Sequence, residues 1–229
     1  MKKNTKKSII CIVAHPDDEA LGPGGTLIKH VMSGDKVNIV ILSKGEESKL
    51  NKDINASRRI KNAKEWSKKT GCNIYKIFNF PDQKLDIVPK LKIIQKLEKI
   101  IQVLLPDIVY THHDGDLNHD HQVVNHAVLT ALRPMNPYGL RSEIRTFETI
   151  SSTDQSPYIE RYIFKPNYYV NIYEIWKSKI NALNAYKSEL KPYPHPRSIK
   201  SLEALAIKRG SESGLKKAEA FQIIKKIWQ

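Results

Sequence analysis

The 229-residue sequence has few of the features that mark disulfide-rich, secreted or membrane-spanning proteins. It has only two cysteines, Cys11 and Cys72, without CxxC spacing, so a disulfide framework is not indicated. No apolar run approaches the roughly 20 residues that a membrane-spanning helix needs. The basic N-terminus is followed by neither a long apolar segment nor a clear cleavage site, as a signal peptide requires. We therefore expect a cytoplasmic protein with no transmembrane segment.

Acidic residues are also scarce, with 24 Asp and Glu against 38 Lys and Arg, which gives a formal net charge of +14. Such an excess is compatible with nucleic-acid binding. The lysines, however, are spread along segments such as 61–69 and 90–92, in the manner of solvated helix faces. We therefore expect no nucleic-acid partner, and an anionic substrate such as a phosphate-bearing sugar remains compatible with the charge.

Apolar runs of strand length alternate with amphipathic segments over the first 132 residues. This rhythm is typical of βαβ units and predicts a parallel sheet. The expected strands cover 8–14, 37–42, 73–80 and 107–111, and the expected helices cover 18–32, 55–70 (with Asn55 as its cap), 88–104 and 120–132.

The rhythm changes after Pro134, where the sequence predicts strands at 144–150 and 168–172. Helices are expected at 174–189, 199–208 and 215–227. We expect this C-terminal third to complete the core and one wall of a pocket within a single domain, 1–229.

The segment Ala14-His15-Pro16-Asp17-Asp18-Glu19 directly follows the first buried run and presents one imidazole and three carboxylates. Loops at the ends of strands are where α/β proteins usually bind their ligands. His15 and Asp18 are three residues apart across a turn, so both side chains can point to one place. A second imidazole, His121, follows the fourth strand, whose end lies near that of the first in a parallel sheet.

Three protein ligands, His15, Asp18 and His121, leave one zinc position for water, which is typical of a catalytic site. Zinc lowers the pKa of its bound water to about 7. Asp17 would accept the water proton as general base, and Asp120 would accept the free ring N–H of a ligating histidine. The alternative is that the carboxylates merely favour a helix N-terminus, which does not account for both segments together.

The AHPDDE loop and the later Asp120-His121 pair resemble the PIG-L/LmbE-like family of zinc-dependent N-deacetylases. This resemblance implies a Rossmann-like three-layer α/β sandwich and removal of acetyl groups from N-acetylglucosamine-type sugars. It also implies His15, Asp18 and His121 as zinc ligands, Asp17 as the base and Arg59 as a substrate contact.

The chain departs from the family pattern where many members carry a histidine three residues before the last ligand, because Asn118 stands there. Asparagine can donate a hydrogen bond to an oxyanion, but it cannot transfer a proton. His113 and His195 are the candidates for protonating the leaving amine, besides Asp17 itself. The substrate-binding candidates are Arg59, Asp120, His195 and Arg197, although a surface turn explains Arg197 nearly as well.

The sequence thus predicts a hydrolase of linear amide C–N bonds that deacetylates an N-acetylated sugar, with Zn²⁺ or, alternatively, Fe²⁺ as the metal. The DLNHDH variant resembles members that modify cell-surface polysaccharide sugars, which favours a nucleotide- or lipid-linked substrate. The same chemistry on a non-sugar or thiol-conjugate amide is one alternative. A basic anion- or nucleic-acid-binding protein on a Rossmann-like scaffold is another, and a homo-oligomer is compatible with all of these readings.

Overall fold

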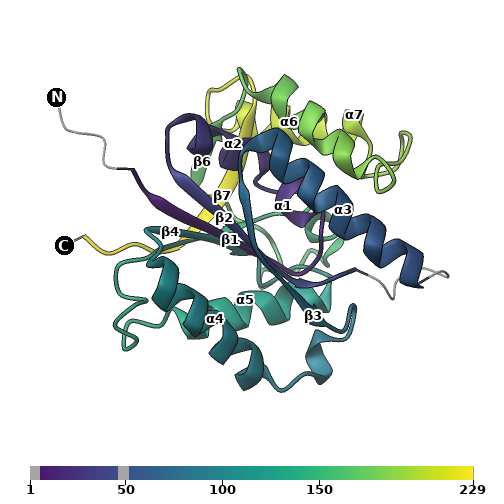
Figure 1. Cartoon of the computed structure of the whole chain (residues 1–229). Helices are drawn as coiled ribbons and strands as arrows, with labels where there is room; N and C mark the ends of the chain where they lie inside the picture. The colour runs from purple at the N-terminus through teal and green to yellow at the C-terminus, as the bar shows by residue number, and fades with distance from the viewer. Residues whose placement is uncertain (1–5, 46–51, 229) are drawn as a thin grey trace.

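A mixed sheet of seven strands forms the centre of the computed structural model, which describes residues 6–45 and 52–228 (Figure 1). The strand order is β3-β2-β1-β4-β5-β7-β6. Strands β3, β2, β1, β4 and β5 run parallel, whereas β7 runs antiparallel to both of its neighbours, β5 and β6. The strands are β1 Ser8–Val13, β2 Lys36–Ser43, β3 Asn73–Phe80, β4 Ile108–His112, β5 Glu143–Phe147, β6 Tyr168–Asn171 and β7 Ala218–Lys225.

Helices cover both faces of this sheet, and Figure 1 shows α4 and α5 on one side and α2, α3, α6 and α7 on the other. The α-helices are α1 Asp18–Leu21, α2 Gly24–Met32, α3 Lys52–Thr70, α4 Lys90–Leu104, α5 His119–Ala131, α6 Trp176–Leu183 and α7 Ile199–Ser211. Short 3₁₀ turns are η1 Leu85–Ile87, η2 Thr153–Gln155 and η3 Asn184–Tyr186. The predicted three-layer α/β sandwich with a mostly parallel sheet is therefore confirmed.

The sequence of β1 is apolar without interruption because both faces of the strand are buried. Its residues alternate between two cores, because Ile9 and Cys11 pack with the α2 and α3 layer while Ile10 and Ile12 pack with the α4 and α5 layer. A central parallel strand is buried on both faces and therefore needs apolar side chains at every position.

The prediction of a helix at 215–227 is wrong, because β7 occupies Ala218–Lys225. The segment Lys217-Ala218-Glu219-Ala220 consists of good helix formers, and local propensity favoured a helix. Tertiary contacts override it, since β7 pairs with β5 on one side and β6 on the other. Glu219 and Phe221 are both buried on this strand.

Three helix predictions differ at their boundaries. The helix expected at 18–32 is interrupted at Gly22 and Pro23, which separate α1 from α2. The helix expected at 55–70 begins at Lys52, so Asn55 lies inside it and is not its cap. The helix expected at 174–189 is shorter, ends at Leu183 and continues as η3.

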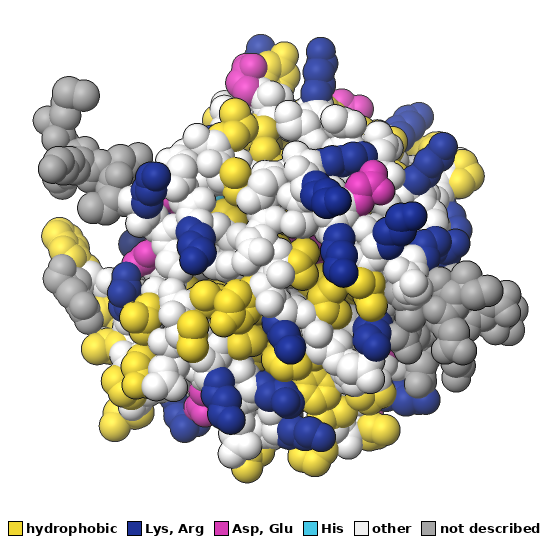
Figure 2. Space-filling model, in the orientation of Figure 1, with side chains coloured by type: hydrophobic (Ala, Val, Ile, Leu, Met, Phe, Trp, Pro, Cys, Tyr) yellow, Lys and Arg dark blue, Asp and Glu magenta, His cyan; other side chains and the backbone are white. Residues whose placement is uncertain are grey.

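The basic residues are scattered over the face drawn in Figure 2, where Lys and Arg side chains are separated by apolar and neutral ones. This distribution agrees with solvated helix faces, and the absence of a nucleic-acid partner stays a prediction. Among the described residues, no helix is both long and apolar enough to cross a bilayer.

Candidate active site

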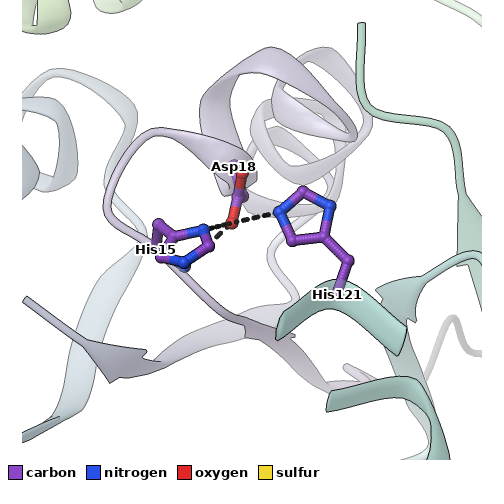
Figure 3. Close-up of side chains that lie close together, drawn as sticks. All are labelled: His15, Asp18 and His121. Carbon is purple, nitrogen blue, oxygen red and sulfur yellow. Dashed lines mark hydrogen bonds and ion pairs between the residues drawn. The ribbon is translucent and has the colours of Figure 1, made fainter. Parts of the chain in front are cut away.

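Three predicted ligands meet at the carboxyl ends of the parallel strands (Figure 3). Asp18 begins α1, directly after β1, and its Oδ2 lies 3.4 Å from His15 Nδ1 and 3.4 Å from His121 Nε2. One ligand atom from each residue lies within 4.8 Å of the others, and all three side chains are buried. The two segments that carry them are far apart in the sequence and are brought together by the pairing of β1 with β4.

The carboxylates and imidazoles of this group shift one another's pKa values. Burial alone would raise the pKa of Asp18, but His121 and His112 outweigh it and hold that pKa well below the usual value. Burial would lower the pKa of His121, but the carboxylates of Asp18 and Asp116 outweigh it and raise it to about 9. Two imidazoles around an ionised carboxylate are a donor set that suits zinc, so the residues fit the predicted metal.

Each histidine of the group is oriented by carboxylates on its other ring nitrogen. His15 Nε2 lies 3.0 Å from Asp120 Oδ2 and 3.1 Å from Asp82 Oδ1. The other contacts of Asp120 are backbone N–H groups of Gln83 at 2.8 Å and Leu85 at 2.9 Å. Asp120 is therefore in contact with His15, as expected of a residue that accepts the free N–H of a ligand.

The second histidine, His121, has its Nδ1 3.2 Å from Asp116 Oδ2. Asp116 in turn accepts hydrogen bonds from Ser152 and Thr153 of the segment after β5. Burial tends to raise the pKa of Asp116, but His121 and these hydrogen bonds lower it to about 2. Asp116 was not among the predicted site residues, although it is the first residue of the DLNHDH segment.

His112 was also missed as a member of the site. Its ring stacks on that of His121 with 3.8 Å between centroids, and its Nε2 accepts the N–H of Ala14 at 3.1 Å. Burial lowers the pKa of His112 to about 4, and His121 adds to the effect. The sequence signal that could have identified His112 is strand alternation. Successive residues of β4 point to opposite faces of the sheet, so His112 and Thr111 point to different faces.

Asp17 lies beside the ligand group in a strained backbone conformation, with φ of 119°. Such a conformation costs a non-glycine residue on the order of 1–3 kcal/mol and is characteristic of functional sites. Its Oδ2 accepts hydrogen bonds from Arg59 Nη2 at 2.9 Å and Arg197 Nη1 at 3.1 Å. Burial raises the pKa of Asp17, and the two guanidinium groups oppose that rise.

Two buried polar atoms of this arrangement have no hydrogen-bond partner among the described residues, namely Asp17 Oδ1 and Arg59 Nε. Buried polar groups in native proteins are nearly always satisfied. These two atoms are therefore candidates for contact with a ligand or with water.

The two histidines that could protonate the leaving amine, His113 and His195, make different contacts from those of Asp17. His113 is buried, its Nε2 lies 3.2 Å from the carbonyl oxygen of Tyr162, and its ring packs on Phe164. His195 is exposed, and its Nδ1 accepts the N–H of Arg197. None of these contacts joins His113 or His195 to the group of His15, Asp18 and His121.

Asn118 caps α5, and its Oδ1 accepts the N–H of Asp120 at 2.9 Å. The amide nitrogen of Asn118 is therefore the end that stays available as a donor. Arg197 is not merely in a surface turn, since its Nε donates to Ser151 and its Nη1 to Asp17.

The fold and the arrangement of this site are those of the PIG-L/LmbE-like family. The family model described as GlcNAc-PI de-N-acetylase matches residues 10–132, which is more than half of the chain, and the chain belongs to this family.

Two known deacetylases match nearly the whole chain. The diacetylchitobiose deacetylase of Thermococcus kodakarensis is 25% identical over 233 residues, covering 96% of this chain and 84% of the relative. The N,N'-diacetylchitobiose deacetylase structure from Pyrococcus horikoshii superposes with a TM-score of 0.78 at 24% identity, covering 96% and 84% of the two chains.

The fold alone does not decide the reaction. The 4-carboxy-2-hydroxymuconate hydratase of Pseudomonas putida superposes with a TM-score of 0.76 at 18% identity, covering 97% of this chain and 98% of that one. The reaction must therefore be argued from the site.

Proposed function

We propose that this chain is a metal-dependent hydrolase that removes the acetyl group from an N-acetylglucosamine-type sugar. The observation that carries the proposal is Asp17, which directly precedes Asp18 of the His15, Asp18 and His121 group and whose buried Oδ1 has no hydrogen-bond partner among the described residues. A deacetylase needs a base at this place, and the diacetylchitobiose deacetylase relative supports an N-acetylated sugar as the substrate class.

His15, Asp18 and His121 would hold the metal, and their nitrogen and oxygen donors favour Zn²⁺, with Fe²⁺ as the alternative. When bound, zinc supplies Lewis acidity that acidifies water and polarises a carbonyl oxygen. Asp120 and Asp116 fix the rings of the two histidines through their other nitrogen atoms.

Asp17 would accept the proton of the attacking water at Oδ1. Arg59 and Arg197 occupy Oδ2, so they hold the carboxylate in one orientation and leave the other oxygen for chemistry. Burial gives Asp17 a raised pKa, which suits a group that must both accept and release a proton. The same oxygen would then return the proton to the departing amine nitrogen. His113 is the alternative proton donor, because its buried Nδ1 also has no hydrogen-bond partner among the described residues.

Asn118 would donate its amide N–H to the oxyanion that forms on the acetyl carbonyl. Its Oδ1 is fixed by the N–H of Asp120, so the donor is oriented before substrate binds. Removing one such donor from a hydrolase costs about 10²–10³ in rate.

The finer substrate assignment rests on charge. Arg197 is partly exposed, and the chain carries a net charge of +14, which favours a sugar with a phosphate, as in a nucleotide- or lipid-linked substrate. His195 lies two residues away and would contact the same substituent. A cytoplasmic location and a homo-oligomer stay predictions.

Acetate release from free, nucleotide-linked and lipid-linked N-acetyl sugars tests the proposal. Zinc-dependent release by the wild type should be lost in Asp17→Asn and kept in the control Glu160→Gln, whose exposed side chain pairs with Lys165. No release from any sugar, with zinc bound, would favour a non-sugar or thiol-conjugate amide. No release and no bound metal would refute the hydrolase, and salt-sensitive nucleic-acid binding unaffected by chelation would then support the binding-protein alternative.

A further inference from the structure

The strained backbone of Asp17 is held by a residue of its own loop that the proposed reaction does not use. Glu19 is fully buried, and its Oε2 accepts the backbone N–H of Asp17 at 3.1 Å. The carbonyl of Asp17 accepts the N–H groups of Ala20 and Leu21 at 3.0 and 2.9 Å. Both backbone groups of Asp17 are therefore fixed, one by the first turn of α1 and the other by the Glu19 side chain.

The other oxygen of Glu19 is bonded to a distant part of the chain. Its Oε1 accepts the hydroxyl proton of Tyr186, which ends η3 and is itself fully buried. The turn η3 packs against α3, the helix that carries Arg59. Tyr186, Glu19 and Asp17 thus form one chain of hydrogen bonds from the C-terminal third to the proposed base.

We propose that Glu19 and Tyr186 are positioning residues that keep Asp17 at positive φ, with its carboxylate between Arg59 and Arg197. The expected effect on catalysis rests on the proposed function, whereas the expected effect on the conformation of Asp17 does not. Without the acceptor on Glu19, the N–H of Asp17 loses its partner and the residue is free to relax to an ordinary φ.

A pair of variants at one position separates the hydrogen bond from the volume of the side chain. Glu19→Gln keeps an acceptor for the N–H of Asp17 and a polar group for Tyr186, whereas Glu19→Met fills similar space without an acceptor. In crystal structures, Asp17 should keep its positive φ and both arginine contacts in Glu19→Gln and lose them in Glu19→Met. An unchanged Asp17 in Glu19→Met would overturn the inference whatever the substrate proves to be.

Kinetics give the second readout. Displacement of a catalytic group by about 1 Å can cost roughly 10²-fold in rate, so kcat of Glu19→Met should fall by about 10- to 100-fold. KM should stay within about twofold, because substrate binding is not what is lost. Glu19→Gln should retain most of the wild-type kcat. Tyr186→Phe should lie between the two, and it provides the test should Glu19→Met fail to fold.

Non-additivity distinguishes positioning from a general structural role. In the Asp17→Asn background, Glu19→Met should lower the residual rate no further, because residues that act through one another are not additive. An equal further loss in that background would refute the inference. If the wild type releases no acetate, the proposed function fails, and the conformation of Asp17 in the two crystal structures still decides this inference.

Discussion

Glu219 joins β7 to the N-terminus of α2, and replacing it tests how much stability this buried contact supplies. Its Oε1 accepts the N–H of Gly25 at 2.7 Å and lies 2.7 Å from Lys179 Nζ. Its Oε2 accepts the N–H of Thr26 at 2.7 Å and the Thr26 hydroxyl at 2.6 Å. Both side chains of the ion pair are nearly buried, with 8% of Glu219 and 5% of Lys179 exposed.

The two partners of this pair should not be equally costly to remove. Within residues 6–45 and 52–228, Glu219→Ala leaves the Lys179 ammonium with the carbonyls of Leu21 and Gly22 as partners, at 3.2 and 3.1 Å. An uncompensated buried charge of this kind costs about 3–5 kcal/mol. Lys179→Met leaves Glu219 with three donors at the positive end of a helix, so its cost should be only about 1–2 kcal/mol.

Urea unfolding of both variants and of the double variant measures this asymmetry. The control is Glu203→Ala, which breaks the more exposed pair with Lys217 and should cost less than about 1 kcal/mol. The double variant should be less destabilised than the sum of the single ones, because they share one contact. A Lys179→Met variant that is as unstable as Glu219→Ala would refute the reasoning.

Three further outcomes follow from the structure. Gly25→Ala should lower the free energy of unfolding, because its Cβ would lie 2.9 Å from Glu219 Oε1. The neighbouring Gly24→Ala has room for a Cβ and should be neutral or stabilising by up to about 1 kcal/mol. Urea unfolding of both variants measures the difference. Burial lowers the pKa of His30 in the folded state, so the unfolded state binds a proton at this residue more readily. The contribution of His30 to stability should therefore fall as pH drops through about 6.5. His30→Gln should flatten that part of the pH dependence, and an unchanged pH profile would contradict the assignment. Zinc should raise the Tm of the apoprotein and a chelator should reverse it, whereas Asp18→Asn should respond to neither.

The metal group could be predicted from the sequence because two short segments contain it. His15 and Asp18 lie in one turn, and His121 opens a helix after the neighbouring strand. The alternating apolar runs placed both turns at one edge of a parallel sheet, where the structure has them. Local pattern and global topology agreed there, and this is why the sequence could bring the three side chains together.

The C-terminal third could be predicted less well, because its structure depends on partners distant in the sequence. The sequence of β7 predicts a helix, and it is the pairing with β5 and β6 that makes this segment a strand. Glu219 gives no local sign that it will cap α2, since Gly25 is 194 residues away. A single sequence contains no period that reports contacts of this range.

These distant contacts are concentrated on the AHPDDE loop and the helix that follows it. Asp17 receives a hydrogen bond from Arg197, and Glu19 receives one from Tyr186. The helix that follows is capped by Glu219. The C-terminal third therefore does more than complete the core, because the geometry of the AHPDDE loop depends on its side chains. Substitutions at Tyr186 or Glu219 should consequently affect the site although neither residue lies in the ligand group, and a fragment that ends before them would contain all three ligands without the geometry.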